Sequence, residues 1–371
     1  MDSMVRRAWV ILTGQSITPD SPLSSITVSG DLVRNKRILI TGAGGSIGSA
    51  LAHAVAARKP AQILLLEASE QALYAIDRDL AAPHTPILAS AGDTAALDEL
   101  FALYRPHIVF HAAAFKHVPL MELHPFAALQ NNAVATFRLA QTAINHNADQ
   151  IILVSTDKAV SPASIMGASK RIAELTTLAL ATSATQIKAV RLGNVYASQG
   201  SVVQLFTEQL AQRRPVTVTD PRATRYFLTV EETAALLLFA LAPQFPSGIL
   251  VPELAAPIRV DDLARALIHA ANSDSPITYI GLRPGEKLHE QLLSNDESFL
   301  DPATNSASAP LRSIRSTTIS VSHAEAAITA LERAIAGRNL HQLLFAVSRL
   351  IPPYQPSNTV LAQQSLAEPR A

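Results

Sequence analysis

The most regular feature of the chain is a series of short apolar runs separated by longer amphipathic stretches. Short runs rich in Ile, Leu and Val are typical of strands buried on both faces, and the stretches between them fit the helical crossovers of a parallel sheet. The pattern predicts an α/β fold with a doubly wound parallel sheet. Its predicted strands are residues 37–41, 62–66, 107–111, 150–155 and 187–191.

The same pattern predicts how the chain is divided. The alternation of strands and helices is regular up to about residue 195 and looser from Ala197 on, where separated short segments indicate a smaller cap. We therefore expect four parts: an extended leader rich in Ser, Thr and Pro at 1–34, the sheet domain at 35–195, a C-terminal cap at 196–300 interleaved with the last sheet elements, and a linker, helix and tail at 301–371.

The carboxy-terminal part contains one well-marked helix. Ser322 and Glu325 have the spacing of a capping box, and Gly337 is a typical helix stop. A Ser/Ala/Pro-rich stretch up to Pro310 predicts a linker ahead of this helix. The residues from Pro352 on are rich in Pro, Gln and Ser, so we expect a frayed end without a chemical role.

Charge and composition narrow the class of protein. The 371 residues include 30 basic and 30 acidic side chains, and this balance argues against the broad electrostatic attraction that non-specific nucleic-acid binding needs. The absence of cysteine excludes disulfides, thiolate nucleophiles and Cys-ligated metals. The apolar runs 8–12 and 234–242 are too short for a signal-peptide core and a membrane span, respectively. We expect a soluble, cytoplasmic protein.

A glycine-rich turn joins the first predicted strand to the helix after it. Gly42, Gly45 and Gly48 stand at its first, fourth and seventh positions, with Ser46 and Ile47 between the last two. Glycines let the backbone turn sharply and approach a pyrophosphate, while the amide groups at a helix N-terminus face the anion. The turn therefore predicts a Rossmann-type dinucleotide site.

The acidic residue Glu67 follows the next predicted strand. A carboxylate at this place binds the ribose hydroxyls of NAD and repels the extra phosphate of NADP, so NAD is the expected cofactor. NADP stays open, because Arg78 follows about three helical turns later. Asp93, after Gly92, is expected either to reach the adenine or to cap a loop.

Three further stretches carry a resemblance to a known family. They are HAAAFKHVPLME at 111–122, STDKA at 155–159 with MGASK at 166–170, and GLRPGEK at 281–287. Together they resemble the bacterial polysaccharide-biosynthesis family of nucleotide-sugar 4,6-dehydratases, which are extended short-chain dehydrogenases. The resemblance covers roughly residues 32–295. It implies a substrate-binding role for the cap, UDP-N-acetylglucosamine as the substrate, a role in surface polysaccharide or glycan biosynthesis, and a homo-oligomer.

A 4,6-dehydratase removes hydride from C4, eliminates water across C5 and C6, and returns the hydride to C6. By resemblance, Thr156 hydrogen-bonds the C4 oxygen, Lys158 takes the C5 proton and Asp157 protonates the leaving hydroxyl. A lysine is a base near neutral pH only when its pKa is lowered, so we expect Lys158 to be buried near another cation such as Lys170. Asp157 must be protonated when it acts.

Met166 departs from the usual short-chain dehydrogenase pattern. Most members have a tyrosine four residues before the lysine on one helical face, and here that position is Met166, ahead of Lys170. A thioether carries no proton, so Asp157 or a water held by Thr156 must accept the C4 proton, and the sequence leaves both open. Methionine here is typical of one branch of the dehydratase family. Lys170 is still expected to contact the nicotinamide ribose.

The resemblance also implies residues that surround the cofactor and the nucleotide sugar. Ala112, Ala113 and Ala114 are implied to line the cofactor, and Asn132 to support the site. The implied arginines suit phosphate oxygens, and the implied glutamate suits ribose hydroxyls. The implied substrate residues are Lys116, Asn194, Thr219, Arg225, Arg283 and Glu286.

Two departures from the family lie in the cap, which leaves its local geometry open. The family usually has glycine where this chain has Ala197, and glycines where Arg213 and Arg214 precede Pro215. A metal is not expected, since the histidines mix strand and loop spacing and the reaction needs none. These histidines are His107, His111, His117 and His124.

Two other functions stay open on the sequence. A UDP-sugar 4-epimerase shares the cofactor fold and the hydride step, but it does not need Asp157 and Lys158 as acid and base at C6 and C5. A cofactor-bound scaffold that has lost catalysis is an alternative of a different class, with Met166 as its mark.

Overall fold

The computed structural model describes residues 3–14, 32–300 and 310–367. Its main sheet consists of β1 (Arg37–Thr41), β2 (Gln62–Glu67), β3 (Thr85–Leu88), β4 (Ile108–His111), β5 (Gln150–Thr156), β6 (Gln186–Leu192), β11 (Gly248–Pro252), β14 (Ser298–Phe299) and β15 (Leu311–Arg315). The helices around it are α2 (Ser46–Ala56), α3 (Glu70–Asp79), α4 (Thr94–Tyr104), α5 (Val118–Leu123), α6 (Pro125–Leu129), α7 (Ala135–Asn145), α8 (Ile165–Ala179), α10 (Val230–Phe239), α12 (Val321–Ala336), α13 (Leu340–Leu350) and α14 (Asn358–Ala367).

The strand order is β14-β15-β11-β6-β5-β4-β1-β2-β3, and every pair from β3 to β11 is parallel. β15 and β14 extend the sheet with antiparallel pairing. The doubly wound fold and its five predicted strands are confirmed. The order reverses between β1 and β4, so a crevice is expected at the carboxyl ends of these strands, where ligands bind in such folds.

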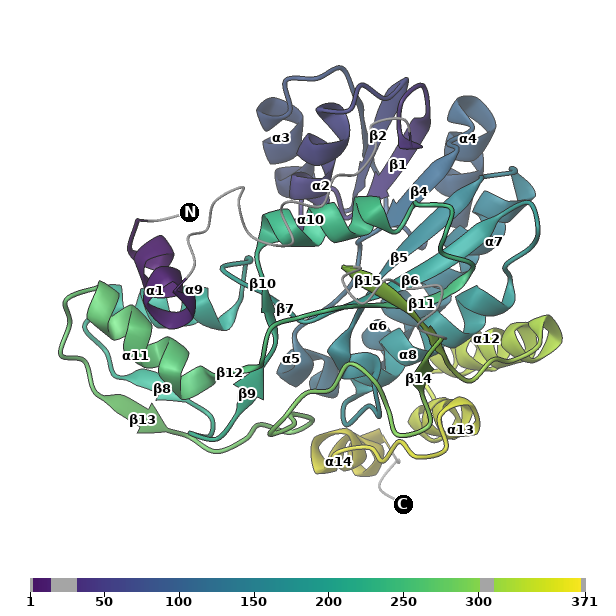
Figure 1. The fold of residues 1–371 in the computed structure, drawn as a ribbon. Coiled ribbons are helices and arrows are strands. Elements are labelled where there is room, and N and C mark those ends of the chain that lie inside the picture. Colours follow the sequence, from purple (N-terminus) through teal and green to yellow (C-terminus); the bar gives the residue numbers. More distant parts are fainter. Residues whose placement is uncertain (1–2, 15–31, 301–309, 368–371) are drawn as a thin grey trace.

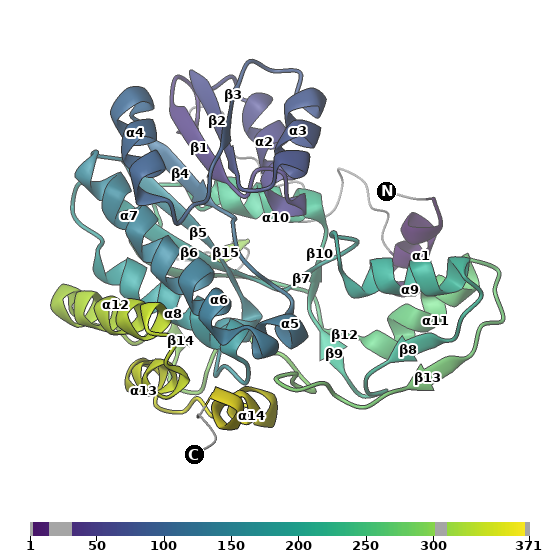
Figure 2. The same ribbon diagram turned by 180° about the vertical axis from the view of Figure 1, so that it is seen from behind.

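The strands bury both faces, as their apolar composition predicts. In β1, Ile38 and Ile40 join a core with α2, α3 and α10, whereas Leu39 joins a core with α4, α7, α8 and the C-terminal helices. Successive strand residues point to opposite faces, which explains this alternation. Figures 1 and 2 show the two helical layers from opposite sides.

The cap forms a separate lobe beside the sheet (Figure 1). Its elements are α1 (Ser3–Thr13), β7 (Asn194–Val195), α9 (Val202–Ala211), β8 (Val216–Val218), β9 (Thr224–Arg225), β10 (Phe227–Leu228), β12 (Ile258–Arg259), α11 (Val260–Ala270) and β13 (Ile277–Tyr279). Residues 248–252, which overlap a segment expected in the cap, belong to the main sheet as β11.

The amino-terminal residues contradict the prediction of an extended leader. Residues 3–13 form helix α1, whose buried Val5, Ala8 and Trp9 share a core with α9 and α11. The Trp9 ring lies 4.5 Å from the Tyr196 ring between centroids, and the Tyr196 hydroxyl donates to the Val5 carbonyl at 2.9 Å. A short amphipathic helix needs such a partner face, which the local sequence does not reveal. Residues 15–31 of the expected leader lie outside the described ranges.

The carboxy-terminal helices differ from expectation in two details. Helix α12 ends at the predicted Gly337, but its N-cap is Ser320, whose side chain accepts from the His323 amide, and not Ser322. The end predicted to fray is ordered up to α14, which contacts α5 and α13, and Tyr354 and Val360 are buried in the core cluster that includes residues of α8 and α13. The expected linker at 301–309 falls outside the described ranges. None of the described helices is long and apolar enough to span a membrane.

An ion cluster inside the sheet domain was not predicted. The Arg191 guanidinium on β6 binds Glu174 of α8 through two bonds of 2.9 Å and Glu297 through bonds of 2.6 and 2.8 Å. All three side chains are almost fully buried. Burial alone would raise the pKa of Glu297, but the contacts with Arg191 lower it to about 2. The cluster joins β6, α8 and the segment before β14.

The two family departures in the cap coincide with left-handed backbone. Ala197 has φ 55° and Arg213 has φ 52°, a region that favours glycine. We expect Ala197→Gly and Arg213→Gly each to raise the free energy of unfolding by about 0.5–1 kcal/mol, because they relieve this strain. The matched control is Ala102→Gly at an exposed position in the last turn of α4, which should lower it by up to about 1 kcal/mol. Urea unfolding measures the stability of all three variants. If Ala197→Gly and Arg213→Gly were less stable than the wild type, the backbone at these positions would not be strained.

Candidate active site

The glycine turn at the carboxyl end of β1 is shaped by close packing. A Cβ on Gly42, which has φ 65°, would lie 2.7 Å from the Ala113 backbone, and one on Gly48 would lie 2.1 Å from the Gly42 oxygen. A Cβ on Gly45 would meet only the Gly42 oxygen, at 3.3 Å. The fold therefore requires glycine at 42 and 48, whereas Gly45 chiefly keeps the backbone bare where helix α2 begins with Ser46 and Ile47.

The two acidic residues expected at the cofactor make different contacts. The Glu67 carboxylate, at the end of β2, accepts from the amides of Gly44, Ala68 and Ser69 at 3.1, 2.9 and 3.0 Å. It therefore ties the end of β2 to the turn. Asp93 caps α4, because its carboxylate accepts from the Ala96 amide at 3.1 Å. Of the two roles expected for Asp93, the structure therefore shows the capping role.

A chain of buried polar groups lies behind the turn. His111 at the end of β4 contacts the Thr41 hydroxyl through Nδ1 at 2.7 Å and the Thr136 hydroxyl through Nε2 at 2.9 Å. Burial, with a smaller effect of Lys170, lowers the pKa of His111 to about 3, so the ring is neutral near pH 7. Both of its nitrogens are engaged by threonines, and the residue serves to fix β1 and β4.

Asn132 holds the loop that follows β4, in the single π-helical turn Gln130–Val134. Its side chain accepts from the Phe115 amide at 2.8 Å and donates to the Phe115 carbonyl at 2.9 Å and to Ser169 of α8 at 3.0 Å. π-turns often occur at functional sites. Asn132 thereby fixes the loop that carries Ala112, Ala113 and Ala114 relative to α8.

The residues at the end of β5 form a tight cluster. Asp157 Oδ1 accepts from the Thr156 hydroxyl and from Lys158 Nζ, both at 2.9 Å. Lys158 Nζ also donates to Asn194 Oδ1 of β7 at 2.9 Å. Asp157 Oδ2 is buried and has no hydrogen-bond partner within the described ranges. The structure thus brings Thr156, Asp157, Lys158 and Asn194 together, with one acceptor atom left over.

The electrostatics of Lys158 differ from expectation. Burial lowers the pKa of Lys158, but the carboxylates of Asp157 and Glu290 outweigh burial and raise it above its usual value. The lowered pKa expected from a neighbouring Lys170 is therefore wrong for this arrangement. Lys170 donates instead to the Val154 carbonyl at 2.7 Å, and burial lowers its own pKa to about 8. Met166, one helical turn before Lys170, is buried.

The residues implied to bind substrate hold the cap segment in place. Arg225 donates to the carbonyls of Thr224, Lys287 and Leu288 at 2.7–3.1 Å. Because these bonds use several of its donors, Arg225 orders the loop after β13.

The other implied substrate residues occupy the surrounding loops. Arg283 and Glu286 pair with each other at 2.5 Å. Lys116 donates to the Gln199 carbonyl, and burial lowers its pKa. Thr219 directly follows β8. Arg283, Glu286 and Lys116 therefore contact protein groups outside the cluster at the end of β5.

Comparison with known proteins places this site in a family. Residues 38–308 match the family model described as polysaccharide biosynthesis protein. The chain belongs to the polysaccharide biosynthesis protein family. This finding confirms the resemblance carried by the three motifs, including the extended short-chain dehydrogenase fold.

Individual relatives agree with this assignment. The chain is 41% identical over 275 residues to a probable polysaccharide biosynthesis protein, EpsC of Bacillus subtilis (strain 168), covering 71% of the chain but 46% of that protein. It therefore spans less than half the length of this relative. It is also similar to a UDP-glucose 4-epimerase of Rickettsia rickettsii, at 33% identity over 71% of this chain and 79% of that protein. The solved structure of Pen from Bacillus thuringiensis matches 71% of this chain and 85% of its own, with 28% identity and a TM-score of 0.66.

Glu290 is a site residue of this family member that sequence reasoning missed. Its buried carboxylate lies 3.9 Å from Lys158 Nζ and 3.8 Å from Lys287 Nζ. The feature of the sequence that could have identified Glu290 is its position, three residues after the GLRPGEK stretch. Its distance of 132 positions from Lys158 in the chain hides the contact from local patterns.

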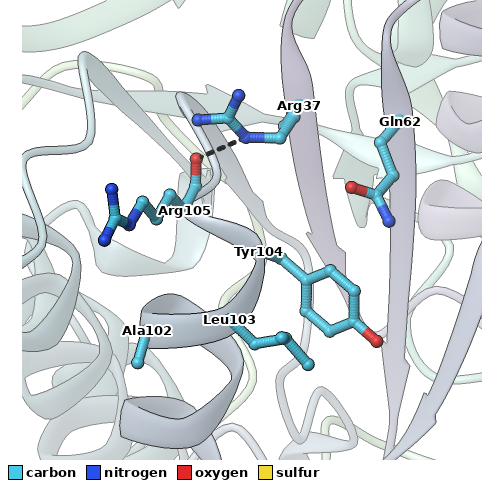
Figure 3. Close-up of a pocket in the computed structure, with 6 residues that line it drawn as sticks. All are labelled: Arg37, Gln62, Ala102, Leu103, Tyr104 and Arg105. Carbon is cyan, nitrogen blue, oxygen red and sulfur yellow. Dashed lines mark hydrogen bonds between the residues drawn. The ribbon is translucent and has the colours of Figure 1, made fainter.

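Two surface hollows lie at the opposite edge of the sheet. Figure 3 shows one of them, lined by Arg37, Gln62 and the end of α4, with the Arg37 side chain donating to the Arg105 carbonyl at 2.9 Å. Arg37 and Gln62 begin their strands, whereas the glycine turn and Thr156 stand at strand ends. These hollows are therefore remote from the candidate site.

Proposed function

We propose that this chain is a nucleotide-sugar 4,6-dehydratase that acts on UDP-N-acetylglucosamine. The observation that supports this most is the contact of 2.9 Å between Lys158 and Asp157 at the carboxyl end of β5. Elimination across C5 and C6 needs a base and an acid side by side, and these are the two groups present. The motifs shared with the family support the nucleotide-sugar substrate.

The pair meets both chemical demands with a single proton. Movement of one proton from the Lys158 ammonium to Asp157 creates an amine and a carboxylic acid, which are the required base and acid. When the amine takes the C5 proton and Asp157 gives its proton to the leaving C6 hydroxyl, water departs and the original ion pair is restored. A raised Lys158 pKa in the resting pair is therefore compatible with its role as a base.

The residues around the turn fit a dinucleotide. The bare backbone at Gly45, the start of α2 and the Glu67 carboxylate would hold the pyrophosphate and the adenosine ribose of NAD. Bound NAD would supply the acceptor and donor for the hydride of C4. Lys170 would contact the nicotinamide ribose, and Thr156 would hold the C4 oxygen.

The Thr156 hydroxyl links the C4 position to the acid–base pair. It donates to Asp157 Oδ1 at 2.9 Å, so a C4 proton accepted at Thr156 or Asp157 reaches the same carboxylate. With both groups then protonated, one proton must leave to solvent before elimination, so that Lys158 is again an amine beside protonated Asp157. After elimination Lys158 returns the C5 proton as the hydride enters C6, and a proton from solvent restores the ion pair. The cycle then ends with the pair in its starting state, which explains how a site with Met166 in place of tyrosine can turn over.

Removal of the Glu67 charge should change cofactor selection. In Glu67→Gln we expect the preference for NAD over NADP to fall about tenfold, because the amide no longer repels the 2′-phosphate. Glu70→Gln in the first turn of α3 is the matched control, since its carboxylate is exposed and lies beyond the β2 end. Calorimetric titration with both dinucleotides measures the ratio. An unchanged ratio in Glu67→Gln would contradict the assignment.

The proposal is tested by incubating the purified protein with UDP-N-acetylglucosamine and NAD. We expect mass spectrometry to show loss of one water, and proton NMR to show a new C6 methyl signal without net NADH. Conversion to a C4-inverted sugar of unchanged mass would instead identify a 4-epimerase.

The 4-epimerase is the second candidate because of the Rickettsia relative named as one. It explains the cofactor turn equally well, but it gives no role to an acid and a base next to C5 and C6. The two candidates therefore differ in what Lys158→Met does, because Lys158 is the group assigned to C5 alone. This variant should strongly slow dehydration, whereas an epimerase that works only at C4 should largely tolerate it.

A further inference from the structure

Glu290 stands out as a buried charge in an unusual position. Its side chain is 4% exposed, and Oε2 has no hydrogen-bond partner within the described ranges. The nearest cations are Lys158 at 3.9 Å and Lys287 at 3.8 Å, both beyond hydrogen-bond distance. Burying a carboxylate without full hydrogen bonding is costly, so neither packing nor a strong ion pair explains this residue.

The backbone just ahead of Glu290 is held in place by residues of β9. Arg225 binds the carbonyls of Lys287 and Leu288, and the Thr224 amide donates to the Leu288 carbonyl at 3.0 Å. The Thr224 hydroxyl contacts His289 Nδ1 at 2.9 Å. Strand β9 thereby fixes the residues just ahead of Glu290 and directs its carboxylate toward the end of β5.

Lys158 is faced by charges from several elements. Asp157 lies beside it on its own turn, Glu290 and Lys287 come from the cap segment, and Arg225 comes from β9. The neutral Asn194 completes the shell from β7. Two carboxylates within 4 Å favour the ammonium form, while the cations of the cap oppose it.

We propose that Glu290 is a positioning residue that sets the proton affinity of Lys158, and with it the pH range in which the Lys158–Asp157 pair is reactive. The inference rests on the proposed function for the role of Lys158 as a base. Glu290 acts through Lys158 and not on the sugar. Without its charge, Lys158 loses its proton at lower pH and is a weaker base for the C5 proton.

The first test measures Lys158 without requiring turnover. Purified protein is labelled with trace acetic anhydride across a pH series, and peptide mass spectrometry gives the labelling midpoint of each lysine. In Glu290→Gln we expect the Lys158 midpoint to fall by about one pH unit, as for the loss of a carboxylate within 4–6 Å. Glu290→Asp, which keeps the charge, should stay close to wild type. Lys36 serves as the internal reference, since it lies in an exposed pair with Asp149.

The matched control is Asp262→Asn, which removes a cap carboxylate that pairs with Arg259 at the surface. It should leave the Lys158 midpoint unchanged. An equal midpoint in wild type and Glu290→Gln, or an equal shift in Asp262→Asn, overturns the proposal, even if Glu290→Gln unfolds more easily or turns over more slowly.

The second test uses the rate of dehydration. In Glu290→Gln the alkaline limb of the kcat profile, which reports loss of the proton shared by the pair, should move to lower pH by the same amount as the labelling midpoint. KM for UDP-N-acetylglucosamine should change little. If kcat falls but the alkaline limb of its pH profile does not move, Glu290 does not control the proton state of Lys158. If the wild type does not dehydrate the sugar although the midpoint moves, the proposed function fails and the coupling of Glu290 to Lys158 stands.

Discussion

Replacement of Lys158 by methionine is expected to lower kcat for dehydration about 10³-fold, because the variant lacks the amine that takes the C5 proton. Methionine preserves much of the side-chain length, and among the residues that the structure describes the amine contacts only Asp157 and Asn194 at hydrogen-bond distance. Binding of NAD should therefore be retained. Asp157→Asn should have an effect of similar size, since an amide cannot protonate the C6 hydroxyl.

The measurement is formation of the 4-keto-6-deoxy sugar, followed by NMR, together with NAD titration and thermal unfolding of each variant. Lys36→Met is the matched control. Lys36 forms an exposed pair with Asp149 at the amino ends of β1 and β5, whereas the candidate site lies at the carboxyl ends of the strands. This variant should keep wild-type kcat. Full activity of Lys158→Met would remove the acid–base pair from the mechanism and favour chemistry restricted to C4.

Loss of Arg191 should have the largest effect on stability. Arg191→Met leaves Glu174 and Glu297 buried without their main cation, and breaking a buried ion pair in this way costs about 3–5 kcal/mol. The neighbouring Arg171, 2.9 Å from Glu174, offsets part of this loss. Urea unfolding measures the change. A triple variant with Glu174→Gln and Glu297→Gln should recover part of the stability, since it removes the uncompensated charges.

Arg138→Met provides the matched control on the surface. Arg138 binds Glu332 through two bonds but is 30% exposed, so its loss should cost less than about 1 kcal/mol. If Arg138→Met and Arg191→Met lowered the free energy of unfolding by the same amount, burial would not determine the contribution of these ion pairs to stability.

The same cluster predicts how stability depends on pH. The folded pKa of Glu297, about 2, lies below its ordinary value of 4.5, so its contribution is complete above pH 4.5 and is lost as the pH falls toward 2. Arg191→Met should flatten this part of the profile.

Much of the site could be predicted from the sequence because its residues stand next to recognisable strand ends. The glycine turn follows β1, Glu67 ends β2, and Thr156 ends β5, so the order of the parallel strands alone brings them to one edge. Asn194 was expected only as a substrate residue, and its contact with Lys158 from β7 was not foreseen.

The two errors about the chain ends share one cause, which is contact between residues far apart in the chain. Helix α1 depends on Tyr196 and α11, and the C-terminal tail is ordered by Glu122, whose carboxylate accepts from Ser357 and from the Ile165 amide at the start of α8. Neither partner is visible in the local pattern. The proline-rich composition of the tail therefore suggested fraying where the fold provides a docking face.

The sequence by itself determined the elements, the parallel sheet, the family and the residues at the strand ends, because periodicity and turn chemistry are local properties. Only the tertiary structure decided the charge environment. Burial lowers the pKa of Lys158, but Asp157, helped by Glu290 from the cap, outweighs burial and raises it, while Lys170 turns away to the Val154 carbonyl. Electrostatic interaction depends on distance and burial in three dimensions, and neither is encoded in the spacing of residues along the chain.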